Sequence, residues 1–126
     1  MSDGPRLIQL ACQMAISAKI KFVNSDIKVA FSVPPLFGSY RPDLFEENID
    51  KAEKLYKFFM DSVSPLDEQI DLFLFETLSS TEEARQMCDF MQGKDKPYMI
   101  SFCLNDETCE LRKGKLTEIG ELIKDF

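Results

Sequence analysis

The chain contains no histidine and no tryptophan among its 126 residues. Without histidine, neither a Ser-His-Asp nor a Cys-His catalytic site can form, and the common zinc sites that use imidazole are excluded. Basic residues are also scarce, because 15 Lys and Arg stand against 22 Asp and Glu and give a formal net charge of -7. Proteins that track nucleic-acid phosphates need clustered Lys and Arg, so we expect no nucleic-acid partner.

Long hydrophobic runs are missing as well. No apolar stretch approaches the roughly 20 residues that span a bilayer, and the start, Met1 to Pro5, lacks the basic and apolar regions of a signal peptide. We therefore expect no membrane association and a cytoplasmic location. The 44% hydrophobic share is typical of a globular chain, and the length suffices for one domain.

The cysteines do not form a recognisable metal-binding or disulfide pattern. No two of them make a CxxC pair, and without a secretion signal we interpret them as reduced, structurally ordinary thiols. The closest pair, Cys103 and Cys109, could bind a metal only if a tight loop brought the two thiols together. The four cysteines are Cys12, Cys88, Cys103 and Cys109.

Hydrophobic periodicity predicts four helices. The first presents an apolar stripe, and the third begins at a Ser80–Glu83 capping box and ends before Gly93. The stripe of the first helix consists of Leu7, Leu10, Ala11, Met14, Ala15 and Ala18. The other three helices are predicted over residues 43–61, 81–92 and 116–123.

Three β-rich segments alternate with these helices. They are Ile27–Val33, Ile70–Phe75 and Tyr98–Leu104. The second is a continuous apolar run, which suits a strand buried on both faces of a parallel sheet. Alternating helices and strands predict an α/β fold built of parallel βα units.

In a parallel α/β sheet, ligands bind beyond the carboxyl ends of the strands. Three segments qualify: Ser32 to Tyr40, with its Pro-Pro-Leu-Phe-Gly loop, the pair Glu76–Thr77, and Ser101 to Asn105. None of them carries a Gly-x-Gly-x-x-Gly or P-loop pattern, so a dinucleotide or nucleoside triphosphate site is not indicated.

Glu76 is the most informative residue of these segments. A carboxylate directly after an apolar strand could hold a substrate ammonium by a charge-assisted hydrogen bond. It could equally accept hydrogen bonds from amides at the start of the following helix. The spacing alone leaves both interpretations open.

Three segments together carry a resemblance to a known family. Ile27–Phe45, with Pro-Pro-Leu and Ser-Tyr-Arg-Pro-Asp, resembles the third-strand region of homocysteine S-methyltransferases. Asp71–Ser80, with its Glu-Thr ending, is similar to the fourth strand, and Pro97–Phe102 to the fifth. The order and spacing agree over nearly the whole chain. Phe31 departs from the pattern, because relatives tend to carry a small residue there, and it could crowd a pocket.

The resemblance implies a (β/α)8 barrel that transfers a methyl group to the thiol of homocysteine and forms methionine. Methyl donors in the family include S-methylmethionine, betaine and methyltetrahydrofolate. Three cysteine thiolates hold a zinc ion that binds homocysteine as its thiolate. By the same resemblance, Glu76 would bind the amino group of homocysteine or another small amino acid. Thr77 and Ser32 are further substrate-binding candidates.

A barrel of this type needs roughly 250 residues. We therefore expect residues 1–126 to form a single partial domain, about half of a TIM barrel, that contains the family's strands three to five. The zinc cysteines of the family lie on strands six to eight, and no cysteine here matches them. The expectation is a chain without zinc that does not transfer methyl groups alone.

Two alternatives remain beside the hypothesis of a partial methyltransferase domain. The chain could be a noncatalytic binding or interaction module derived from the same barrel, or a piece of a split or incomplete gene. A half-barrel exposes open strand edges and one side of its strands, for which we expect Phe31, Phe73 and Phe75 as exposed residues. We therefore expect the chain to self-associate or to pair with a complementing half-barrel, or else to be marginally folded.

Overall fold

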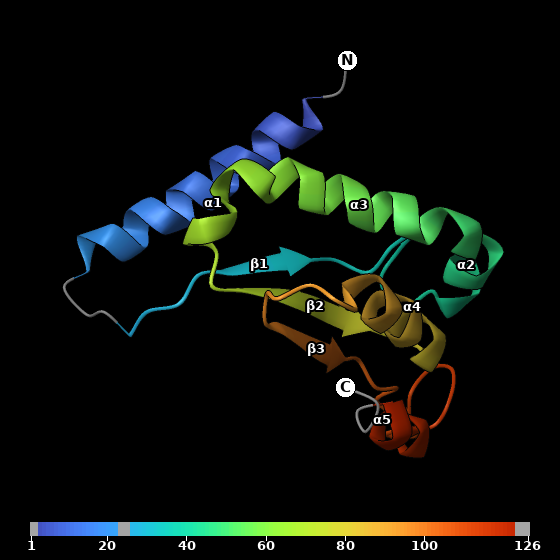
Figure 1. Cartoon of the computed structure of the whole chain (residues 1–126). Helices are drawn as coiled ribbons and strands as arrows, with labels where there is room; N and C mark the ends of the chain where they lie inside the picture. Colours follow the sequence, from blue (N-terminus) through green and yellow to red (C-terminus); the bar gives the residue numbers. More distant parts are fainter. Residues whose placement is uncertain (1–2, 23–25, 123–126) are drawn as a thin grey trace.

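Three parallel strands form the centre of the protein. The computed structural model describes residues 3–22 and 26–122. In it, β1 (Ala30–Val33), β2 (Leu72–Leu78) and β3 (Tyr98–Phe102) form one sheet in the order β1-β2-β3. All three arrows point the same way (Figure 1), and both pairings are parallel. The predicted α/β class is confirmed.

Helices connect and cover the strands. In Figure 1, α1 and α3 lie side by side along one side of the sheet. Within the described ranges, no helix combines the length and hydrophobicity that a transmembrane segment requires. The α-helices are α1 (Gly4–Lys21), α2 (Pro42–Glu47), α3 (Ala52–Val63), α4 (Thr81–Met91) and α5 (Leu116–Leu122), and the 3-10 helices are η1 (Ile49–Lys51) and η2 (Ser64–Gln69).

The helix-facing side of the sheet is an aromatic core. Phe73 and Phe75 are 4% and 1% exposed, and Phe31 is also buried. The Phe31 ring lies edge-on to Phe73, with centroids 6.0 Å apart, and also contacts Phe59 of α3. The expectation that these three phenylalanines lie on an exposed side is therefore wrong, and Phe31 cannot crowd a pocket on the other side. Side chains point alternately to the two faces of a strand, and all three phenylalanines occupy positions that point towards the helices.

The opposite side of the sheet has no covering layer in the described part of the chain. We call it the open face. Four of its residues are exposed and three are half-buried. The open face consists of Ala30 and Ser32 of β1, Leu72, Leu74 and Glu76 of β2, and Met99 and Ser101 of β3.

Helix α1 turns a different side to the core than its apolar stripe predicts. The buried residues are Cys12 and Ile16, with Ile8 packed beside them, whereas Leu10 and Met14 are 46% and 68% exposed. The stripe prediction is wrong, because α1 carries apolar residues on two sides and periodicity cannot tell which one meets α3.

The second predicted helix is divided into three segments. Its apolar residues Phe45, Ala52 and Tyr56 are buried as the periodicity predicts. The helix is interrupted at Asn48, whose side-chain amide donates to the carbonyl of Leu44 at 2.9 Å. Asparagine side chains compete with the backbone for such carbonyls, and α2, η1 and α3 take the place of one continuous helix.

The predicted start of α4 is confirmed. Ser80 is the N-cap, and its hydroxyl accepts a hydrogen bond from the Glu83 amide at 3.2 Å. Beyond the C-terminal end of the helix, Gly93 adopts a left-handed φ of 75°, which glycine tolerates without steric cost. Because α4 begins only three residues after β2, its first turn lies next to the carboxyl end of the sheet.

Candidate functional site

The carboxyl ends of the strands bring together the residues singled out from the sequence. β2 does not end before Glu76 but continues through Glu76 and Thr77 to Leu78. Ser32 lies on β1 and Ser101 on β3. All four residues therefore lie at the same end of the sheet, where parallel α/β folds bind their ligands.

Glu76 and Ser32 are directly hydrogen-bonded across two strands. The hydroxyl of Ser32 donates to Oε1 of Glu76. Ser32 pairs with Leu74 in the ladder, and Glu76 lies two residues further along the same face of β2, within reach of a diagonal contact. In the first turn of α4, the amide of Glu83 donates to the hydroxyl of Ser80. The hydrogen-bond partner of Glu76 is instead the hydroxyl of Ser32 on the neighbouring strand.

A β-bulge places Glu76 and Thr77. Phe75 pairs with Ile100 and Leu78 pairs with Phe102, so β2 has one residue more than β3 between these two pairs. Thr77 takes the extra position with a left-handed φ of 63°, which is an outlier for a β-branched residue. Its amide donates to the hydroxyl of Ser101 at 3.2 Å. Bulges are frequent beside active sites, where they redirect a side chain.

The resulting arrangement is suited to binding a cation. Glu76 supplies two carboxylate oxygens, and only one of them accepts from Ser32. The carboxylate is half-buried, and the aliphatic chains of Leu74 and Met99 lie beside it on the open face. A carboxylate at the border of an apolar surface forms strong charge-assisted hydrogen bonds with an ammonium group.

Loops from β1 and β3 meet near this end of the sheet. The aromatic ring of Tyr40 lies under the guanidinium of Arg112, 5.0 Å from ring centroid to guanidinium carbon. A hydrogen bond with the thiol of Cys103 raises the pKa of the Tyr40 hydroxyl. The amide of Cys103 also donates to the carbonyl of Leu78 at 2.8 Å, which ties the end of β3 to β2.

Glu83 is a residue whose role the sequence did not indicate. The capping-box pattern predicted a reciprocal bond with Ser80, but Oε1 of Glu83 accepts from the amide of Leu36 at 3.2 Å. Its side chain is 2% exposed. Burial raises the pKa of this carboxyl to about 7, although hydrogen bonds from the Leu36 and Ser79 backbones lower it. No signal in the sequence distinguishes this buried carboxylate from an exposed helix-start glutamate.

The cysteines do not fit the zinc site of the resemblance. Cys12 and Cys88 are buried, Cys103 is half-buried and Cys109 is exposed, and all four are free. Within residues 3–22 and 26–122, no three His, Cys, Asp or Glu side chains form a group that could hold a metal ion. The described residues therefore do not fit a three-thiolate zinc site.

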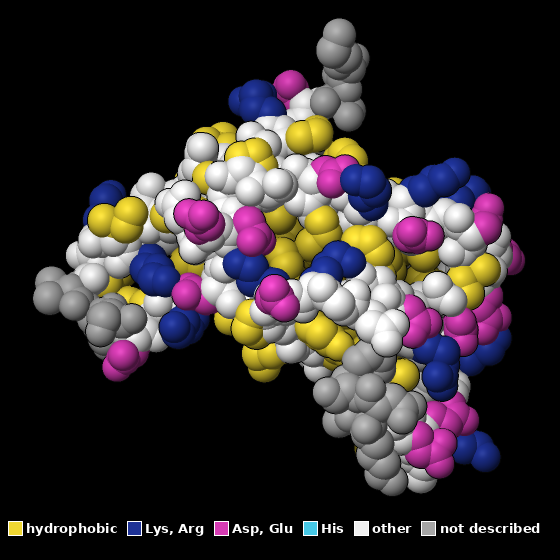
Figure 2. Space-filling model, in the orientation of Figure 1, with side chains coloured by type: hydrophobic (Ala, Val, Ile, Leu, Met, Phe, Trp, Pro, Cys, Tyr) yellow, Lys and Arg dark blue, Asp and Glu magenta, His cyan; other side chains and the backbone are white. Residues whose placement is uncertain are grey.

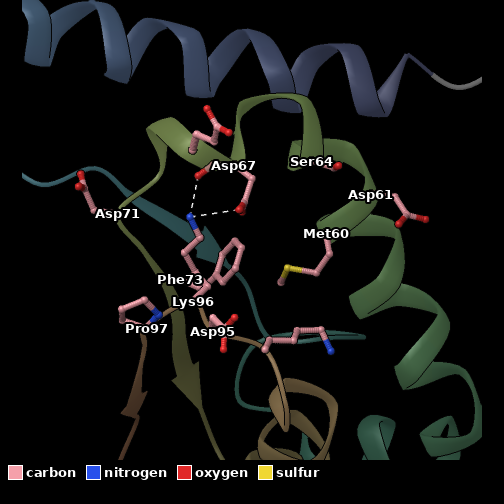
Figure 3. A pocket seen from close by; sticks show the side chains of 11 residues that line it. Met60, Asp61, Ser64, Asp67, Asp71, Phe73, Asp95, Lys96 and Pro97 are labelled. Carbon is pink, nitrogen blue, oxygen red and sulfur yellow. Dashed lines mark hydrogen bonds and ion pairs between the residues drawn. The ribbon is translucent and has the colours of Figure 1, made fainter.

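A separate hollow of about 830 Å³ lies at the opposite, amino-terminal end of the strands. Figure 2 shows hydrophobic side chains at its floor, between α3 and the sheet, with acidic and basic side chains around them. Figure 3 shows Lys96 reaching towards Asp67. The ammonium of Lys96 donates to the carbonyls of Asp67 and Ile70 at 2.6 and 2.7 Å, so it satisfies the C-terminal end of η2, a structural role.

Comparison with protein families finds a match over nearly the whole chain. A family model described as homocysteine S-methyltransferase matches residues 2–125. No curated protein and no solved structure matches the chain.

Proposed function

Since the chain belongs to the homocysteine S-methyltransferase family, we propose that Glu76 binds the amino group of homocysteine or a similar small amino acid. The Glu76–Ser32 pair on the open face is the observation that carries this proposal. In this arrangement the carboxylate accepts a hydrogen bond from the substrate ammonium, while the hydroxyl of Ser32 holds the Glu76 side chain in its orientation. Thr77 and Ser101 hold the backbone of the bulge that presents Glu76.

The expected affinity of the chain alone is low. A hydrogen bond to a charged group contributes about 1.5–3 kcal/mol, and a ligand on the open face would be covered from one side only. A dissociation constant of 1 mM corresponds to about 4 kcal/mol, so we expect a dissociation constant of about 1 mM or weaker.

We further propose that the three βα units correspond to strands three to five of the family's barrel. The open face then represents part of the barrel wall that faces the substrate, and the helices represent its outer layer. The role assigned to these residues is substrate binding. Activation of the thiol and methyl transfer are not assigned to these residues. We propose that the 126-residue chain alone does not catalyse methyl transfer. A cytoplasmic location is part of the same proposal.

A noncatalytic interaction module is the second candidate. It is favoured by the outer edges of β1 and β3, which have no pairing strand in the described part of the chain, and by the exposed open face. Unpaired strand edges recruit further strands. The partner would be a second copy of the chain or a complementing half-barrel.

A ligand titration followed by amide NMR distinguishes the two candidates. Reduced homocysteine should shift the amides of Ser32, Glu76 and Ser101, whereas its desamino analogue should not. Glu76→Gln should weaken binding at least about tenfold, equivalent to ~1.4 kcal/mol. The matched control is Glu68→Gln, an exposed carboxylate at the other end of the sheet.

Equal binding of both compounds, or an unchanged affinity of Glu76→Gln, would contradict the proposed function. Broadening of open-face amides with protein concentration, and without any effect of ligand, would favour the interaction module instead.

A further inference from the structure

Arg112 lies at the same end of the sheet as Glu76. Beyond β3 the chain folds back on itself and runs beside the connection between β2 and α4. There Lys113 pairs with Ser80 in a parallel bridge, and the amide of Lys113 donates to the carbonyl of Ser79 at 3.2 Å. Neighbouring strands are about 4.8 Å apart, so the backbone at Arg112 lies about one strand spacing from the segment that directly follows β2.

The guanidinium of Arg112 contacts an aromatic ring and not a carboxylate. Its central carbon lies 5.0 Å from the centroid of the Tyr40 ring. Arg6 and Arg41 each form an ion pair with an aspartate, but within residues 3–22 and 26–122 no carboxylate pairs with Arg112. A contact with a ring face positions the cation but accepts none of its N–H groups in a conventional hydrogen bond. These donors are therefore open to an acceptor from solution.

Tyr40 carries this cation over the end of β2. It belongs to the loop after β1 (residues 34–41), and its hydroxyl interacts with the thiol of Cys103, directly after β3. Because β2 is the central strand, a contact between the segments that follow β1 and β3 crosses the carboxyl end of β2. Cys103 continues the alternation of Met99 and Ser101, so this crossing lies on the side of the sheet that carries Glu76.

We propose that Arg112 binds the α-carboxylate of the amino acid whose ammonium group Glu76 binds, an assignment that rests on the proposed function. An α-amino acid carries both charges on one carbon, so its site needs an acidic and a basic side chain close together. Glu76 and Arg112 supply these charges at one end of the sheet, and in the described part of the chain they do not pair with each other. A guanidinium also matches a carboxylate with two parallel N–H···O bonds.

The assignment narrows the substrate class to free α-amino acids. An amine without the carboxylate, or an amino acid whose carboxyl group is an amide, loses the contact with Arg112. The segment that carries Arg112 is held by other contacts as well, because the Lys113 ammonium pairs with Glu46 of α2 and the Lys113 amide is bonded to Ser79. Removal of the guanidinium should therefore affect carboxylate recognition more than the position of this segment.

Binding of two thiols to the full chain, followed by amide NMR, tests the assignment. Homocysteine is compared with 3-aminopropane-1-thiol, which has the same ammonium and thiol but no carboxylate. The wild type should bind homocysteine about fivefold more tightly, the factor that ~1 kcal/mol represents. Arg112→Met should abolish this preference by weakening homocysteine binding alone, and Arg112→Lys should keep part of it. The matched control is Arg85→Met, at an exposed arginine of α4, which should change neither affinity.

The outcomes separate this assignment from the proposed function. Binding that depends on Glu76 but is equally tight for both thiols, or a preference that survives in Arg112→Met, would overturn the role of Arg112 and leave the role of Glu76 standing. An Arg112→Met variant that weakens both thiols equally would show a purely structural arginine and overturn the assignment too. If Arg112→Met does not fold, the wild-type preference and Arg112→Lys decide. No binding of homocysteine to the wild type would overturn both proposals.

Discussion

The two faces of the sheet differ in what they can do. On the helix-facing side, rings interlock: Phe75 lies edge-on to Tyr56 of α3 and to Tyr98 of β3, with centroids 5.9 and 6.3 Å apart. On the open face, Ser32, Glu76 and Ser101 stand among aliphatic side chains. The first face excludes water and supplies stability, whereas the second keeps polar groups accessible to a ligand or partner.

Two glutamates show the same contrast. Glu76, on the open face, is half-buried and has a hydroxyl partner, while Glu83, on the helix side, is buried and its pKa is raised to about 7. A carboxylate in water ionises freely, but a buried one must replace its hydration by hydrogen bonds. The position of a carboxylate relative to the sheet therefore decides how much of its hydration it keeps.

Truncation on the two faces should have the most unequal effects. Phe75→Ala is expected to destabilise the chain by about 3–5 kcal/mol, because it leaves a cavity between α3 and the sheet. Met99→Ala, at a residue 58% exposed on the open face, should stay within about 0.5 kcal/mol. Urea unfolding of both variants measures the difference. Similar losses would mean that the open face is covered in solution.

The pH dependence of stability should come mainly from the helix side. The pKa of Glu83 is raised from 4.5 to about 7 on folding, so the folded state binds this proton more tightly than the unfolded state. Stability is then highest below pH 4.5 as far as Glu83 is concerned, and it falls as the pH rises to about 7. The loss amounts to about 3 kcal/mol at 1.36 kcal/mol per pKa unit.

Chemical unfolding at several pH values measures that slope. Glu83→Gln should flatten it, and Glu76→Gln should leave it in place. Equal slopes in the wild type and in Glu83→Gln would show that the Glu83 carboxyl is hydrated in the folded state.

Self-association should depend on the open face. We expect the chain to associate with rising concentration, and Met99→Glu to weaken that association about tenfold, ~1.4 kcal/mol. Met14→Glu is the matched control, because Met14 is 68% exposed on α1, away from the open face. Light scattering at several concentrations checks both. A strictly monomeric wild type would contradict this expectation, and a larger effect of Met14→Glu would place the association on α1.

Local signals predicted much of the fold. The Ser80 cap and the alternation of helices and strands were readable, because each depends on residues close in sequence. The prediction that the apolar run before Glu76 is buried on both faces is wrong, because Phe73 and Phe75 are buried but Leu72 and Leu74 are half-buried on the open face. The same analysis placed both Glu76 and Ser32 at the carboxyl ends of their strands, where parallel α/β sheets bind ligands. The substrate-binding roles of Glu76, Thr77 and Ser32 stay predictions.

Other features depended on contacts between distant segments. The bulge at Thr77 arises from pairing with β3 and stabilisation by Ser101. The buried side of α1 is chosen by the surface of α3, and not by the strength of its own apolar stripe. Likewise, strand alternation predicts which residues share a face with Phe31, Phe73 and Phe75, but it does not say which face of the sheet that is. The position of the helices decides that these rings lie in the core.

The sequence by itself determined the element types, the parallel α/β class and the family, because periodicity, caps and motifs are written along the chain. The tertiary structure alone decided that Glu83 serves as a buried acceptor for Leu36. A glutamate in a first helical turn ionises normally when exposed. Its pKa and its role change only when the loop after β1 and the ring of Tyr56 remove it from water.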